Sequence, residues 1–200
     1  MEKKHLVLAS GSPRRKELLS QLGYEFSVLV TDVEECKHTQ ETAEEYVKRL
    51  SLDKALAALS LLTTNPSEKQ HVASGSDTVV LGSDTVVVSQ GQVLEKPADF
   101  FDSKRMLTQL ANGRHQVMTA VSVVSKEKQK TEIVITDVWF KPLSEKEIEQ
   151  YWQTGEPCDK AGSYGIQGLG GRFVTRIEGS YYAVVGLPLF ETDQLLQEFL

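Results

Sequence analysis

The sequence predicts an α/β protein built on a mixed β-sheet. Short apolar runs of strand length, such as 6–9 and 26–30, alternate with helical patterns that begin at clear N-caps. Two longer β-rich runs, 116–124 and 131–140, flank a polar turn at 126–128 and predict an antiparallel hairpin. Because alternating units and hairpins occur in one chain, we expect an elongated, twisted mixed sheet in two lobes with a central cleft.

The composition is that of an ordinary globular protein with excess negative charge. The chain has 200 residues and a net charge of −6, which argues against nucleic-acid binding through a broad basic face. Its two cysteines, Cys36 and Cys158, make no disulfide framework and have no CxxC spacing. No apolar run reaches the length of a membrane span or of a signal-peptide core. We therefore expect a cytoplasmic protein with no membrane or nucleic-acid partner.

The first motif is a tight turn, Ser10-Gly-Ser12, that opens a helix near the N-terminus. Ser12 is the expected N-cap, and Pro13 occupies the first helical position, where its missing N–H costs nothing. The next residues, 14–16, are Arg-Arg-Lys, at the end of the helix where the dipole already favours negative charge. This placement suits a bound anion, and a solvated basic helix start is the alternative.

A second helix begins at the capping box Thr42-Ala-Glu-Glu45 and is expected to run to about Leu61. Lys54 falls inside its apolar stripe, so its side chain either extends out to solvent along its alkyl stem or points into a polar cleft to meet an anion. The acidic patch 31–35 directly follows a predicted strand, a common ligand position in α/β folds, although a solvated loop is the simpler interpretation.

Asp84 interrupts an otherwise apolar β run. Since an unpaired buried carboxylate costs several kcal/mol, this residue needs a cation or a catalytic role. The sequence around it, 82–87, repeats an earlier copy at 75–80, in which Asp77 is the equivalent residue. The second copy leads through a hairpin loop to Glu95-Lys-Pro97, and we place Asp84 at a strand–turn junction.

The rest of the chain continues the alternation. We expect helices over 99–110 and 144–155, the second opened by a capping box, and a final helix over 187–200. Between them, 172–177 and 181–185 predict a closing hairpin.

A glycine-rich loop occupies the segment before this hairpin. Five glycines lie within ten residues, at positions 162, 165, 168, 170 and 171. Such a loop lets the backbone approach a ligand closely, with Lys160 and Gln167 as its polar contacts. It matches neither the dinucleotide-binding nor the Walker pattern.

Taken together, four separate segments offer cations to an anion. They contribute Arg14 with Arg15, Lys54, Lys96 and Lys160. Acidic residues at neighbouring strand ends, Glu34 or Glu35 together with Asp84, supply oxygen ligands for a divalent metal. Charge neutralisation, positioning and activation of a water are the requirements of phosphoryl chemistry, so the residues predict polyphosphate binding with metal-assisted hydrolysis.

Four ordered motifs resemble the Maf family of nucleotide pyrophosphatases over nearly the whole chain. They are 9–15 (Ala-Ser-Gly-Ser-Pro-Arg-Arg), 81–87 (Leu-Gly-Ser-Asp-Thr-Val-Val), 95–97 (Glu-Lys-Pro) and 159–168 (Asp-Lys-Ala-Gly-Ser-Tyr-Gly-Ile-Gln-Gly). The resemblance implies one domain over 1–200, with two lobes, an active-site cleft between them and an inosine-triphosphatase-like fold of Maf/Ham1 type. It also implies dependence on Mg²⁺ or Mn²⁺ and cleavage between the α- and β-phosphates of a nucleoside triphosphate.

The resemblance further assigns roles to single residues. Asp84 matches the family's proposed proton acceptor, because its distance to Glu95-Lys-Pro97 fits and that of Asp77 does not. Glu35 matches a cleft glutamate and, with Asp84, is the expected metal ligand. The positions that match phosphate contacts are Ser10, Arg14, Arg15, Lys54 and Lys96, and we add Lys160 from the loop. Arg14, Thr85 and Gln167 match the positions that separate the family's subgroups.

This pattern resembles the branch that acts on dTTP and UTP, with modified pyrimidine nucleotides as further substrates. A glutamine amide can both donate to and accept from a pyrimidine edge, which gives Gln167 a physical basis for selection. Two alternatives stay open: a nucleotide-binding regulator of cell division or septum formation with incidental hydrolysis, and a scavenger of non-standard nucleotides. Self-association as a homodimer is also open. Ser83 stands where the family usually has Ala, with no evident role.

Overall fold

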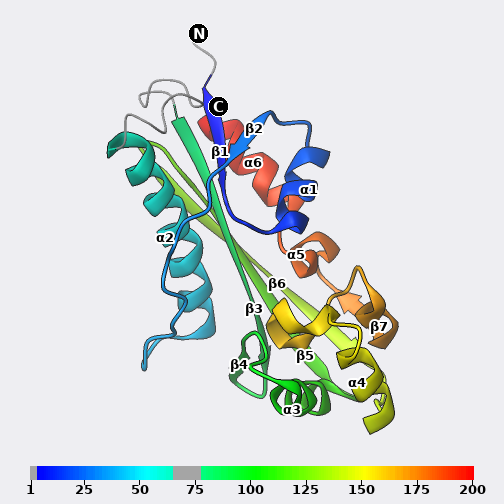
Figure 1. The fold of residues 1–200 in the computed structure, drawn as a ribbon. Helices are drawn as coiled ribbons and strands as arrows, with labels where there is room; N and C mark the ends of the chain where they lie inside the picture. The colour runs from blue at the N-terminus through cyan, green and yellow to red at the C-terminus, as the bar shows by residue number, and fades with distance from the viewer. Residues whose placement is uncertain (1–3, 65–77) are drawn as a thin grey trace. The chain divides into compact units, whose positions relative to one another are not determined.

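The computed structural model describes residues 4–64 and 78–200 and contains a seven-stranded mixed sheet (Figure 1). Strand order is β2-β1-β3-β5-β6-β7, and β4 pairs with β3. β1 runs parallel to both β2 and β3, whereas the β3–β4 and β6–β7 pairs are antiparallel. The predicted mixed α/β class is confirmed. Of the first copy of the repeat, residues 75–77, including Asp77, lie outside the described residues, whereas 78–80 belong to β3.

The chain divides into two compact units. Unit 1 comprises Met1–Asp84, Thr119–Ile133 and Gly186–Leu200, and unit 2 comprises Thr85–Met118 and Val134–Val185. The strands β3 (Thr78–Ser89), β5 (Arg114–Val124) and β6 (Gln129–Phe140) each contribute residues to both units. The predicted cleft between two lobes stays a prediction.

Unit 1 packs a long helix onto parallel strands. Its remaining elements are β1 (His5–Ala9), α1 (Pro13–Gln21), β2 (Phe26–Val28), α2 (Ala43–Thr64) and α6 (Leu189–Phe199). Small residues of α2, Ala55 and Ala58, pack with Val7 and Val80 in one buried cluster. Short side chains on the helix let it approach the strands closely, which matters for the site described below.

The predicted helix signals of unit 1 are confirmed. The Ser12 hydroxyl accepts a hydrogen bond from the Arg15 backbone N–H, and Gly23 follows the helix in a left-handed conformation, φ 78°. At the start of α2 the Thr42 hydroxyl accepts from the Glu45 N–H, while the Glu45 carboxylate accepts from the Thr42 N–H. These caps determine where the cationic turn and the lysine-bearing helix begin.

Unit 2 has its own apolar core. Its elements are β4 (Gln92–Leu94), α3 (Phe100–Leu110), α4 (Glu145–Trp152), three short 3₁₀ turns (Glu156–Asp159, Ala161–Ser163, Leu169–Phe173), β7 (Val174–Glu178) and α5 (Tyr181–Val185). Phe140, Tyr151, Tyr164 and Phe173 form a buried group of rings with edge-on contacts. The predicted helices over 99–110 and 144–155 correspond to α3 and α4.

Two local predictions were wrong. Residues 181–185 form the helix α5 instead of a strand, because the Ser180 hydroxyl accepts from the Ala183 N–H as an N-cap does and outweighs the β-propensity of Tyr-Tyr-Ala-Val-Val. Asp84 lies in the middle of β3 and not at a strand–turn junction, since the turn comes at Gln90-Gly91, where both φ angles are positive. Among the described helices, none is long and apolar enough to cross a membrane.

Candidate active site

The close approach of α2 to β3 determines where Asp84 and Lys54 meet. A Cβ on Gly82 would lie 2.2 Å from the Ser51 carbonyl oxygen and 2.9 Å from the Ala55 nitrogen, so only glycine fits beneath the helix. Asp84 follows two residues later on the same face of the strand, and Lys54 follows Ser51 by about one helical turn. The two side chains are therefore placed opposite each other by backbone packing.

Lys54 pairs with two carboxylates at once. Its Nζ lies 2.7 Å from Asp84 Oδ1 and 2.6 Å from Glu35 Oε1. The side chains of Lys54 and Asp84 are only 12% and 10% exposed, whereas that of Glu35 is 42% exposed. Asp84 thus has the cation that its burial requires. Lys54 therefore points inward and does not extend to solvent. The anions that it contacts there are the two carboxylates.

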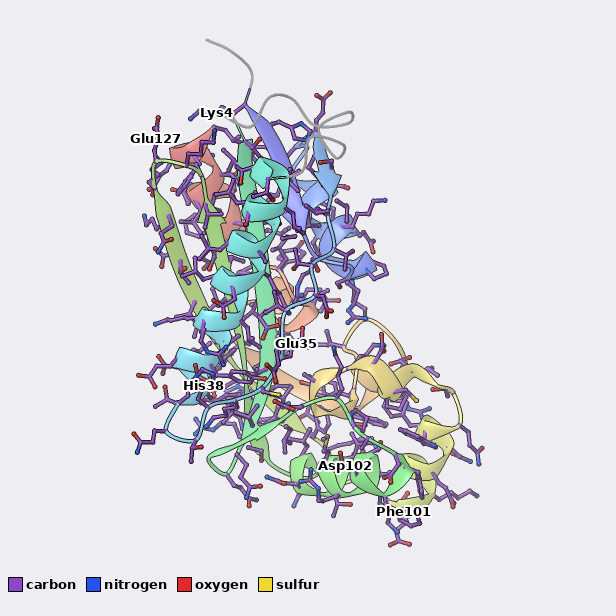
Figure 2. All side chains as sticks on the ribbon, turned by 60° about the vertical axis from the view of Figure 1, so that its left-hand side comes forward. Lys4, Glu35, His38, Phe101, Asp102 and Glu127 are labelled. Atoms are coloured by element: carbon purple, nitrogen blue, oxygen red, sulfur yellow. The ribbon has the colours of Figure 1, made fainter. Side chains whose placement is uncertain are left out.

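Glu35 is held against α2 by contacts of its own backbone segment. The Tyr46 hydroxyl donates to the Glu35 carbonyl at 3.0 Å, and Arg49 Nη2 donates to the Cys36 carbonyl at 2.9 Å. Figure 2 shows Glu35 on this segment, between β2 and α2. Glu35 is therefore tied to the cluster, while Asp32 and Glu34 of the same acidic patch are exposed on a loop.

Arg15 joins the cluster from the N-terminal turn. Its Nε donates to the Gly186 carbonyl at 2.9 Å, and the same carbonyl accepts from the buried Ser83 hydroxyl at 3.1 Å. Burial lowers the pKa of Arg15, the charges of Asp84 and Glu35 oppose this, and neighbouring Arg14 adds to the lowering. The guanidinium therefore lies within the field of both carboxylates.

The turn itself is ordered by its serines. The Ser10 hydroxyl is buried and accepts from the Ser12 N–H at 3.2 Å, and the Ser12 hydroxyl caps α1. Arg14 is half-buried. The backbone amides, the helix N-terminus and the arginines thus come from one short segment, as an anion site requires.

The two carboxylates also bear on the predicted metal. Within residues 4–64 and 78–200, no three His, Cys, Asp or Glu side chains converge as a fully protein-ligated metal requires. Asp84 and Glu35 nevertheless meet at one nitrogen, so their oxygens are neighbours. Mg²⁺ in nucleotide sites is commonly held by one or two carboxylates together with substrate phosphates and waters. The pair fits that mode of binding.

In unit 2 the glycine-rich loop packs against two other predicted motifs. The Gly162 N–H donates to the Glu95 carbonyl at 3.1 Å, next to Lys96, which is exposed. Gly162 has φ 69°, and a Cβ there would lie 2.8 Å from the Val87 side chain on β3. Glycine is needed at this position for both its conformation and the close approach. The loop, the Glu-Lys-Pro segment and the end of β3 are therefore brought together.

A residue that sequence reasoning missed, Glu156, organises this loop. Its carboxylate accepts from the Leu169 N–H at 2.8 Å, the Gly170 N–H at 3.0 Å and the Tyr151 hydroxyl at 2.7 Å. Burial raises its pKa, but these donors and the charge of Lys160 outweigh burial and lower the pKa overall. The available signal was a pair of acidic residues, Glu156 and Asp159, just ahead of a glycine-rich segment with many backbone N–H groups to satisfy.

Lys160 is held within its own loop. Its Nζ donates to the Glu156 carbonyl at 2.8 Å and to Asp159 Oδ1 at 2.7 Å, and its side chain is largely buried. Gln167 is exposed on the same loop, and Thr85 is half-buried on β3. The predicted residues thus divide between the units, with Ser10, Arg14, Arg15, Glu35, Lys54 and Asp84 in unit 1 and Thr85, Lys96, Lys160 and Gln167 in unit 2, and we call these sets the two clusters.

Comparison with known proteins gives three findings. A family model described as "Maf-like protein" matches residues 5–199. The dTTP/UTP pyrophosphatases of Vibrio parahaemolyticus and Vibrio cholerae are 69% and 62% identical to this chain, covering 98% and 97% of it and 97% of each relative. The solved structure of the Staphylococcus aureus Ham1 protein matches with a TM-score of 0.46 and 17% identity, over 68% of this chain and 72% of that one.

Proposed function

The chain belongs to the Maf-like protein family, and we propose that it hydrolyses dTTP and UTP to the monophosphate and pyrophosphate. Relatives that share 69% and 62% of its residues over nearly their whole length carry the name dTTP/UTP pyrophosphatase. The observation that carries the proposal is the buried Asp84, paired with Lys54 beside Glu35 and Arg15. This cluster combines a proton acceptor with cations suited to phosphate.

In this proposal the unit 1 cluster binds the phosphates and activates the attacking water. Asp84 accepts the proton of the water, and Lys54 beside it compensates the negative charge. Arg15 holds a phosphate in an orientation set by its bond to Gly186, with Ser10 and Arg14 from the same turn. Lys96 and Lys160 contribute further positive charge from unit 2.

We propose Mg²⁺ or Mn²⁺ as the cofactor, with Asp84 and Glu35 as its protein ligands. The ion would neutralise phosphate charge and polarise the scissile bond when bound. Lys54 contacts both carboxylates, so it is placed to exchange one of these contacts for a phosphate oxygen.

Recognition of the base is assigned to Arg14, Thr85 and Gln167. Gln167 is exposed on a loop whose backbone is held from both sides, so its amide is available to a pyrimidine edge. We also propose that both clusters bind one nucleotide, in a cleft between two lobes of a single domain.

The decisive assay measures pyrophosphate release from a nucleotide panel with Mn²⁺ or Mg²⁺. We expect turnover of dTTP and UTP and little of inosine or xanthosine triphosphate, and the reverse preference would point to a scavenger. Asp84→Asn should lower kcat by at least about 10²-fold. Asp102→Asn, which alters a carboxylate paired with Arg105 on α3 (Figure 2), is the matched control and should leave kcat unchanged.

A cytoplasmic location agrees with the cysteine content, since two cysteines, Cys36 and Cys158, make no disulfide framework. Localisation of the tagged full chain by cell fractionation tests this. Whether the enzyme works as a homodimer is tested by light scattering of the purified protein.

A further inference from the structure

We propose that Glu156 is a positioning residue for base selection, which holds the glycine-rich loop in the conformation that presents Gln167 to the substrate. The inference rests on the proposed function, because it assumes that Gln167 contacts the base. It goes beyond that function in assigning a role to a residue that need not touch the substrate at all.

The hydrogen-bond network of Glu156 reaches residues on both sides of Gln167 in the sequence. Downstream of Gln167, the Leu169 and Gly170 N–H groups donate to the carboxylate. Upstream, the Gly165 N–H donates to the Tyr151 hydroxyl at 3.1 Å, and that hydroxyl in turn donates to Glu156 Oε1 at 2.7 Å. Both arms of the loop are therefore fixed to one carboxylate, with Gln167 between them.

Steric contacts agree with the hydrogen bonds. A Cβ on Gly168 would lie 2.3 Å from Glu156 Oε2 and 2.5 Å from its Cδ, so the loop backbone rests directly on the carboxylate. A Cβ on Gly165 would lie 2.7 Å from Lys160 Cε, and the Lys160 ammonium is bonded to the Glu156 carbonyl. Glycines on both sides of Gln167 thus allow the loop to close around Glu156.

The chemistry requires an acceptor here, and therefore a carboxylate rather than an amide. Two backbone N–H groups and one hydroxyl point at the two oxygens, and an ionised carboxylate accepts all of them. In Glu156→Gln one oxygen becomes an NH₂ group, which faces at least one donor with another donor. The change removes charge-assisted bonds without altering side-chain volume, so it loosens the loop without opening a cavity.

The test compares Glu156→Gln with Glu147→Gln. Glu147 is the matched control because it also accepts several bonds, from the Ser144 N–H and Ser144 hydroxyl and from Lys141, but at the opposite end of α4. KM and kcat are measured for dTTP, UTP and CTP, and Ki for inorganic tripolyphosphate, which presents phosphates without a base. Thermal unfolding of each variant shows whether it is folded.

For Glu156→Gln we expect KM for dTTP and UTP to rise about tenfold and discrimination against CTP to shrink, as the loss of one to two charge-assisted bonds implies. Ki for tripolyphosphate should stay within about twofold, since the phosphate contacts of unit 1 are untouched and Lys160 is bonded to the Glu156 backbone carbonyl, which the substitution leaves in place. Tyr151→Phe, which removes only the bridge to Gly165, should shift KM the same way by a smaller factor. Glu147→Gln should change none of these values.

Equal losses toward all nucleotides and tripolyphosphate would overturn the proposal and leave Glu156 a purely structural residue. Unchanged KM in both Glu156→Gln and Tyr151→Phe would overturn it as well. Calorimetric Kd values for dTTP and tripolyphosphate in an Asp84→Asn background repeat the comparison without turnover. If the unaltered enzyme fails to hydrolyse dTTP, the proposed function is wrong, but the ratio of the Kd values for dTTP and tripolyphosphate still tests the positioning role. If the protein does not bind dTTP at all, both proposals are wrong.

Discussion

The two clusters are held together by different kinds of groups. In unit 1, charged side chains from a turn, a helix and a strand neutralise one another, with Lys54 between Asp84 and Glu35. In unit 2, backbone N–H groups of a glycine-rich loop converge on the carboxylate of Glu156. Side-chain charge suits phosphates, which look alike in every nucleotide, whereas a shaped backbone suits a base, which differs between them.

The largest effect should come from removing the shared cation. Lys54→Met takes away the cation that Asp84 and Glu35 share and, with it, the proposed phosphate contact, so kcat/KM for dTTP should fall about 10³-fold. Preference among bases should not change, because Gln167 and its loop are intact. Lys48→Met, an exposed lysine on the same helix, is the control. A change in base preference with little loss of rate would show that the unit 1 cluster selects the base, contrary to the proposed separation of phosphate binding from base selection.

The buried His115 of unit 2 should make the fold sensitive to acid. His115 is buried, its Nε2 pairs with the Tyr164 hydroxyl at 2.8 Å, and burial lowers its pKa to about 4 while Asp137 opposes this. His115 takes up a proton near pH 6.5 in the unfolded chain but only near pH 4 in the folded chain. Its contribution to the free energy of unfolding is therefore complete above about pH 7 and falls by about 3 kcal/mol toward pH 4.

Urea unfolding of the wild type and of His115→Gln, at several pH values, measures this contribution. Glutamine keeps a donor for Tyr164 but does not titrate, so the variant should lack this part of the pH dependence. If the free energy of unfolding depends on pH in the same way in both proteins, groups other than His115 govern the response to acid.

Arg14 is assigned both to phosphate binding and to base selection, so a substitution there tests whether the two roles are separate. Arg14→Trp should lower kcat/KM for dTTP and UTP by about 10-fold to 100-fold, with a smaller loss for GTP, if this residue helps select the base. Steady-state kinetics on the three nucleotides measures it. A uniform loss would make Arg14 one more phosphate contact and sharpen the contrast between the clusters.

The smallest effect concerns Ser83, whose role the sequence left unexplained. Its hydroxyl and Arg15 Nε donate to the same Gly186 carbonyl, so Ser83 supports the segment that orients Arg15. Ser83→Ala should raise KM for dTTP about fivefold, the worth of about one neutral hydrogen bond. Ser122→Ala removes another buried strand hydroxyl, bonded to Ser51 and Thr131, and should leave KM unchanged. Equal shifts in both variants would contradict a specific role.

The sequence predicted the charged cluster better than the loop. Asp84 was found because a carboxylate in an apolar run demands a partner, and its partner proved to be Lys54. The position of Lys54 in an apolar stripe showed that the side chain was unusual, but left open whether it turned outward or inward, because the groups that face it come from distant segments. The resemblance assigned roles to most of the other residues, and those roles stay predictions.

Glu156 shows why the loop was harder to predict. Its partners are mainly backbone N–H groups, and their directions depend on φ and ψ angles that residue types do not reveal. The helix α5 was missed for a related reason, since Tyr-Tyr-Ala-Val-Val favours a strand and the Ser180 cap decides otherwise. Propensity describes single residues, whereas these features depend on hydrogen bonds between segments.

The mutual pairing of Lys54, Asp84 and Glu35 has a consequence for ionic strength. Together with Arg14 and Arg15, these groups carry a net charge of only about +1, so the cluster presents a small net field to an approaching triphosphate. The Lys54–Asp84 pair is also shielded from solvent, and such pairs are only weakly screened by salt. The number of basic residues in the site would therefore overstate its sensitivity to added salt.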